Sequence, residues 1–142
     1  MKKYQHVLFA TDLDERSESA AEYARDFAAL LDAKFSMLHI VQVVAAAYGY
    51  VGDYDFEQQI VEDAHAEMAR LAGKLGVESG SCQVVKGYPK EDLLRKAKQM
   101  GVDLIILHGH RHHWLGMLGS TANSIVNKAE CDVLVLSAES KN

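Results

Sequence analysis

The residues best suited to chemistry in this chain end a glycine- and histidine-rich stretch, at Gly119-Ser120-Thr121. Free N–H groups at the start of a helix attract anions, and glycine lets a phosphate approach the backbone. The hydroxyls of Ser120 and Thr121 add two donors. The same residues also suit an ordinary helix start with Ser120 as N-cap, so both interpretations remain open. A phosphate site is the first hypothesis for this segment.

A second polar group, Asp12, stands two residues after the end of the first apolar run of the chain, behind Thr11. Its carboxylate could cap the turn into the next helix, or it could reach a ribose, a base or a cation. Ligands of open α/β sheets gather at the carboxyl ends of strands, where the strand order reverses. The position of Asp12 after a predicted strand therefore supports the binding role.

Histidines crowd a short run at His108, His110, His112 and His113, which raises the hypothesis of a metal site. The run lacks a defined ligand spacing, and no carboxylate or cysteine lies within it. Loop histidines beside a phosphate site more often donate hydrogen bonds or titrate near neutral pH. We therefore predict no metal ligands here.

The chain contains few signs of an enzyme. It has no Gly-x-Ser-x-Gly elbow, no P-loop with its lysine and no paired-carboxylate motif. Cys82 and Cys131 stand far apart without a local activating motif, and we expect two reduced thiols in a cytoplasmic protein. No catalytic residue is predicted.

Composition limits the class of protein. The 142 residues are 49% hydrophobic and 25% charged, which is typical of one globular domain spanning residues 1–142. A net charge of -5, with no run of basic residues longer than two, argues against a nucleic-acid partner. The apolar run at residues 7–10 is too short for a signal peptide or a membrane span.

Apolar strand patterns alternate with helical patterns along the chain. Strands are predicted at residues 4–10, 35–44, 83–86, 103–107 and 132–136. Helices are predicted from Asp14 or Ser17 to Leu31, over 56–75, from Pro89 to Gly101 and from near Gly119. A loop is predicted at 45–55 and a frayed tail at 137–142. Continuous apolar strands belong to sheets covered on both faces. The pattern predicts an α/β fold, an open five-stranded parallel sheet of order 3-2-1-4-5 with helices on both faces.

In a sheet of this type the order reverses between the first and fourth strands. The segments that leave these two strands are residues 11–14 and 108–120, which are also where the sequence becomes acidic, glycine-rich or histidine-rich. Topology and composition therefore predict one site at the carboxyl edge of the sheet.

Several segments together resemble the universal stress protein family. They are residues 6–13, Leu38-His39-Ile40, Gly87-Tyr88-Pro89, residues 103–106, residues 119–123 and residues 131–136, in the family's order over essentially the whole chain. The resemblance implies the adenine nucleotide alpha hydrolase-like fold and a role in the stress response. It also implies a homodimer joined through the last strand at Val133–Val135.

Members of this family that bind ATP carry the pattern Gly-x2-Gly-x9-Gly-[Ser/Thr] after the fourth strand. Gly109, Gly119 and Ser120 keep its second half, whereas Ile106 replaces the first glycine. That glycine lets the backbone approach the ligand. Two alternatives follow: a branched side chain blocks the nucleotide, or Ile106 belongs to the strand and the loop is reshaped around Gly109.

By resemblance, the ligand would be ATP with Mg²⁺, with the nucleoside next to Asp12 and Ile40. The ribose and phosphates would face Gly109, His110, Gly119, Ser120 and Thr121. The alternative is a dimeric stress regulator or scaffold that binds no nucleotide, with Ser120 or Thr121 as phosphoacceptor. Catalysis would amount at most to slow ATP hydrolysis or autophosphorylation, because no general base is identified.

Overall fold

A parallel sheet forms the centre of the molecule. The computed structural model describes residues 3–42, 54–109 and 119–137. Its strands are β1 (His6–Ala10), β2 (Lys34–Gln42), β3 (Cys82–Gly87), β4 (Leu104–His108) and β5 (Asp132–Leu136). They pair in parallel in the order β3-β2-β1-β4-β5. The predicted α/β class and strand order are confirmed, and the last strand matches its prediction at both ends.

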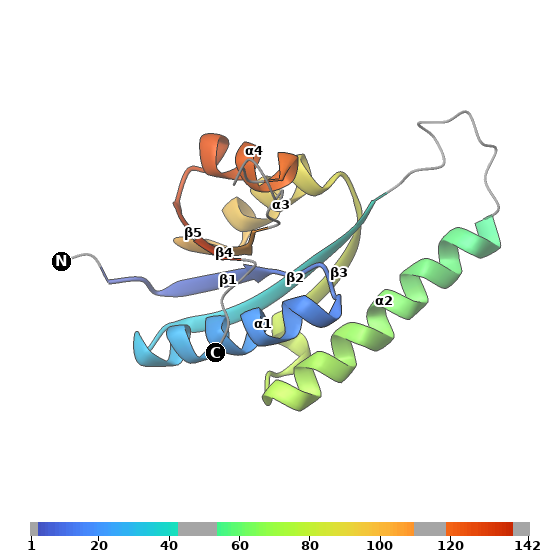
Figure 1. Cartoon of the computed structure of the whole chain (residues 1–142), viewed down its shortest axis with the longest axis horizontal. Coiled ribbons are helices and arrows are strands. Elements are labelled where there is room, and N and C mark those ends of the chain that lie inside the picture. Colours follow the sequence, from blue (N-terminus) through green and yellow to red (C-terminus); the bar gives the residue numbers. More distant parts are fainter. Residues whose placement is uncertain (1–2, 43–53, 110–118, 138–142) are drawn as a thin grey trace.

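Helices cover both faces of the sheet. The described residues form α1 (Glu15–Leu30), α2 (Tyr54–Leu75), α3 (Pro89–Gln99) and α4 (Ser120–Lys128), with a short 3-10 turn, η2 (Ser79–Ser81). The helices α1 and α2 lie on one face, and α3 and α4 lie on the other (Figure 1). Within the described part of the chain, no helix combines the length and the apolar character needed to span a bilayer.

The helix ends follow local chemistry. Asp14, not Ser17, caps α1, since its Oδ1 accepts a hydrogen bond of 2.8 Å from the Ser17 amide. Gly76 ends α2 with a φ of +69°, the left-handed conformation that glycine adopts without strain. At α4 the N-cap is Gly119 and Ser120 is already helical. The interpretation of Ser120 as N-cap is therefore wrong.

The core has two layers, one on each face of the sheet. Val7 and Phe9 of β1 pack toward α1 and α2, and Leu8 between them packs toward α3 and α4. Both faces of β1 are buried, and for this reason its residues from Val7 to Ala10 are all apolar. Each fully buried large apolar side chain contributes roughly 1.5–3 kcal/mol.

One apolar residue at the helical spacing of the buried α2 residues is not in the core. Ala64, Met68, Leu71 and Leu75 are buried, whereas Ile60 is 41% exposed. The first turns of α2 stand out from the body of the sheet (Figure 1).

Some predictions fall on residues outside the described part of the chain. They are most of the loop at 45–55, His110 with the rest of the histidine run up to His113, and the last five residues of the tail.

Candidate functional site

A cleft of about 600 Å³ opens at the carboxyl ends of β2, β1 and β4. Its walls come from these strand ends, from α2 and α3, and from the first turn of α4. This size is typical of small-molecule sites, and the position is where ligands bind in open parallel sheets. Of the residues predicted for the site, those that line the cleft are Asp12, Ile40, Gly119, Ser120 and Thr121.

Gly109 is not among the residues that line this cleft. It is buried, and its amide donates a hydrogen bond of 2.8 Å to the carbonyl oxygen of Leu136. The bond continues the pairing of β4 with β5 by one residue. The structure therefore does not bring Gly109 together with Asp12 and Gly119.

Ile106, which replaces the first glycine of the nucleotide-binding pattern, belongs to β4. Its side chain is fully buried in the core layer beneath α1 and α2, and it does not line the cleft. The residues that follow it, Leu107 and His108, do line the cleft. Of the two alternatives, Ile106 therefore belongs to the strand, and its side chain does not block the cleft.

A tight turn after β1 holds Asp12 at the cleft. The Thr11 hydroxyl accepts a hydrogen bond of 3.0 Å from the Leu13 amide, and Leu13 has a φ of 61°. The Asp12 amide donates to the buried Ser17 hydroxyl at 3.4 Å. Because Asp14 already caps α1, Asp12 does not fill that role, and its exposed side chain lines the cleft.

His39 is a lining residue that the sequence analysis did not select. Its Nδ1 lies 2.7 Å from the carbonyl oxygen of Thr11. A carbonyl oxygen only accepts, so Nδ1 carries the proton. In the sequence, His39 could be noticed only as a single histidine inside an apolar strand. Its hydrogen-bond partner, Thr11, is set by the pairing of β1 with β2.

The start of α4 presents backbone donors to the cleft. The first intrahelical bond joins the Asn123 amide to the Gly119 carbonyl oxygen at 2.9 Å. The amides of Ser120, Thr121 and Ala122 precede it and have no acceptor within their own helix. No acidic side chain lies in this first turn. Since the dipole of the helix adds positive potential here, the arrangement suits an anion.

The start of α3 forms another part of the wall, through Pro89. The Asp92 carboxylate accepts a hydrogen bond of 2.6 Å from the Tyr88 amide and pairs with Arg95 at 2.9 Å. The Tyr88 amide, and then Arg95, lower the pKa of Asp92 below its ordinary value. A Cβ on Gly87 would overlap the Asp92 carboxylate, which explains glycine at the entry to this helix.

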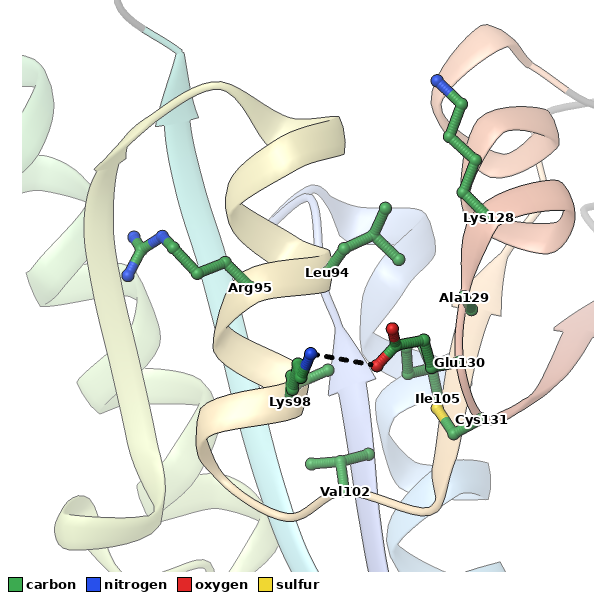
Figure 2. A pocket seen from close by; sticks show the side chains of 10 residues that line it. Leu94, Arg95, Lys98, Val102, Ile105, Lys128, Ala129, Glu130 and Cys131 are labelled. Atoms are coloured by element: carbon green, nitrogen blue, oxygen red, sulfur yellow. Dashed lines mark ion pairs between the residues drawn. The ribbon is translucent and has the colours of Figure 1, made fainter.

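A second hollow, of about 390 Å³, lies at the opposite edge of the sheet between α3 and the residues that precede β5 (Figure 2). Arg95, Lys98 and Lys128 line it, but their charges do not converge. Lys98 pairs with Glu130 at 3.5 Å, while Arg95 and Lys128 point away from that pair. We therefore consider the first cleft the better candidate site.

The donor set of the cleft does not form a metal site by itself. Among the described residues, no group of three His, Cys, Asp or Glu side chains could hold a metal ion. Asp12 is the only carboxylate among the described residues that line the cleft. One carboxylate suits Mg²⁺ that is held mainly by substrate phosphates and water.

Comparisons with known proteins identify similar chains. A model of the universal stress protein family matches residues 3–137. Universal stress protein A homolog 2 of Coxiella burnetii is 36% identical over 141 residues, which cover 96% of this chain and 97% of that protein. Universal stress protein A of Escherichia coli K12 is 25% identical, with 94% of each chain covered.

Solved structures with this architecture include the protein MJ0577, with a TM-score of 0.75, 26% identity and 99% of each chain covered. A universal stress protein in complex with cAMP has a TM-score of 0.64 at 20% identity, over 97% of this chain and 100% of that one. Both have the same fold as the present chain.

Proposed function

This chain belongs to the universal stress protein family, and from that premise we propose that it is a cytoplasmic stress-response protein whose cleft binds ATP with Mg²⁺. One observation carries the proposal. Asp12, Ile40 and the start of α4 at Gly119, which are far apart in sequence, line one cleft where the strand order reverses.

The chemistry of the cleft suits the parts of a nucleotide in order. Apolar Ile40 at the end of β2 suits the base, and the carboxylate of Asp12 after β1 suits the ribose hydroxyls. The amides and hydroxyls of Ser120 and Thr121 suit the phosphates. Mg²⁺ would be held by the phosphates with Asp12 nearby, and it would neutralise phosphate charge.

A protein of the same fold has been solved in complex with cAMP, which is an adenine nucleotide. That likeness supports the proposal that this fold can bind an adenine nucleotide. We propose binding rather than turnover as the main activity, because Asp12 is the only described carboxylate that lines the cleft. A single carboxylate that also faces Mg²⁺ is poorly placed as a general base.

We also propose a homodimer that pairs through β5. Among the described strands β5 pairs only with β4, so no described strand occupies its other edge. The Leu136 carbonyl points to β4, where it accepts from Gly109. Since the backbone groups of a strand alternate in direction, those of Val133 and Val135 point outward, where a second copy could pair with them.

The test is to denature freshly purified protein and to separate the released small molecules by anion exchange with mass detection. Release of adenine nucleotide in near-stoichiometric amount supports the proposal. Titration of the stripped protein with MgATP in a calorimeter then gives the affinity. Absence of released nucleotide, together with no heat at millimolar MgATP, would overturn the proposal and support the scaffold alternative with Ser120 or Thr121 as phosphoacceptor.

A further inference from the structure

The second hollow, between α3 and the residues that precede β5, shares no lining residue with the cleft. Its volume of about 390 Å³ lies within the range of small-molecule sites. Ala97 of α3 and Ala129, which follows α4, line it, and their small side chains leave the space between the two helices unfilled. The hollow is therefore a separate place where a ligand could bind.

The floor of the second hollow is apolar. Val102 and Ile105, which are 8% and 0% exposed, belong to the core layer that α3 and α4 cover. Leu94 and Cys131 also line the hollow and are only partly buried. An apolar group that covers these four residues would remove their exposed surface from water, which is favourable in proportion to the area.

One ion pair spans the second hollow. The Nζ of Lys98 on α3 lies 3.5 Å from the Oε2 of Glu130, which precedes β5, and Figure 2 shows the pair between the two walls. Both side chains are 74% exposed, and exposed pairs add little stability, so this pair opens at small cost. Glu130 is the only carboxylate among the described residues that line the hollow. Its carboxylate occupies the place beside Lys98 that the anionic group of a ligand would take.

We propose that the second hollow binds a small apolar carboxylate, of the class of a medium-chain fatty acid. The apolar body covers the floor, and the carboxylate replaces that of Glu130 as the partner of Lys98. Arg95 and Lys128 also line the hollow, so positive charge exceeds negative charge around it and favours an anion. Because its walls come from α3, from β4 and from the residues before β5, the hollow suits a small molecule better than an extended peptide.

The two partners of the ion pair give opposite tests, with octanoate as the probe. Glu130→Gln keeps the size of the side chain and releases Lys98, so we expect it to tighten octanoate binding about threefold. Lys98→Gln removes the cation and should weaken binding about fivefold. Lys86 and Glu57 provide a matched control, since they form a similar pair at 3.6 Å on β3 and α2 and do not line the hollow. Lys86→Gln and Glu57→Gln should bind octanoate as the wild type does.

The experiment titrates ¹⁵N-labelled protein with octanoate and with neutral octanamide and follows the backbone amides by NMR. We expect octanoate to shift the amides of Ala97, Ile105 and Cys131 and to leave that of Thr121 in the cleft unchanged. Octanamide, which lacks the charge, should bind about fivefold more weakly. Ala129→Leu should abolish the shifts, because the larger side chain would fill part of the hollow. Equal thermal unfolding midpoints would show that the variants are folded.

Three results reject the inference. Octanoate affinity that is the same in Lys98→Gln and wild type excludes the ion pair as the place of the carboxylate. Equal affinity for octanoate and octanamide excludes selection of an anion. Octanoate shifts that are absent, or that lie only outside the hollow, exclude the hollow as the site.

Discussion

The Nδ1 atom of His39 donates a hydrogen bond of 2.7 Å to the carbonyl oxygen of Thr11. A backbone bond of 2.9 Å from the Thr11 amide to the Leu38 carbonyl oxygen lies beside it. Together they tie the exit of β1 to the end of β2 at the floor of the cleft. Because Asp12 follows Thr11, we infer that His39 positions the Asp12 turn at the cleft.

Replacing His39 should therefore weaken nucleotide binding through the Asp12 turn. We expect His39→Leu to lower MgATP affinity about fivefold, the usual effect of one lost hydrogen bond. His39→Asn should recover most of the affinity, since the asparagine amide can donate from nearly the position of Nδ1. Calorimetric titration of both variants checks this. If asparagine and leucine give the same affinity, His39 has only a packing role.

Gly119→Val should weaken MgATP binding by at least tenfold, because its side chain would occupy the path of the phosphates to the start of α4. The φ of Gly119 is -61°, which any residue adopts, so the backbone itself is not strained. Gly80→Val is the control, since open space surrounds its Cβ position away from the cleft. Equal affinity in Gly119→Val and wild type would contradict a phosphate site at α4.

Proline substitutions in β5 should separate dimer formation from folding. Val135→Pro removes an outward N–H, and we expect a folded monomer in analytical ultracentrifugation. Leu134→Pro removes an N–H that points to β4, and we expect it to destabilise the fold by about 1–3 kcal/mol because a carbonyl of β4 loses its donor. A Val135→Pro variant that sediments as wild type would exclude pairing through this edge.

Acid should destabilise the protein through His6. Its Nδ1 lies 3.1 Å from the Met100 carbonyl oxygen and its Nε2 lies 2.8 Å from the Ser36 hydroxyl. Burial lowers the pKa of His6, opposed by the hydrogen bond to Met100. The unfolded chain therefore binds the proton more tightly, and the free energy of unfolding decreases as pH falls below about 6.5 toward the lowered pKa.

Urea unfolding between pH 7 and pH 5.5 measures this effect. His6→Asn should flatten the loss of stability over this range, whereas the same change at exposed His65 should leave it unaltered. The prediction fails if His6→Asn loses as much stability on acidification as wild type does.

Much of the fold follows from the sequence because its signals are local. Residues 133–136 form an apolar run between Asp132 and Ser137, and a short apolar run with such boundaries predicts a strand. Gly76 and Gly101 end helices because a positive φ suits glycine in any fold. The alternation of strands and helices then permits few sheet topologies. In the parallel sheet that forms, β1 pairs with β4, so Asp12 after β1 and Gly119 after β4 follow neighbouring strands.

The remaining features depend on contacts between distant segments. Ile60 has the helical spacing of the buried residues Ala64, Met68 and Leu71, yet it is 41% exposed. Gly109 matched a nucleotide-binding pattern, yet the register of β4 against β5 directs its amide to Leu136. The sequence by itself determined the elements and the edge of the sheet where the cleft opens. Only the tertiary structure decided which side chains meet there, because strand register and helix packing set those distances.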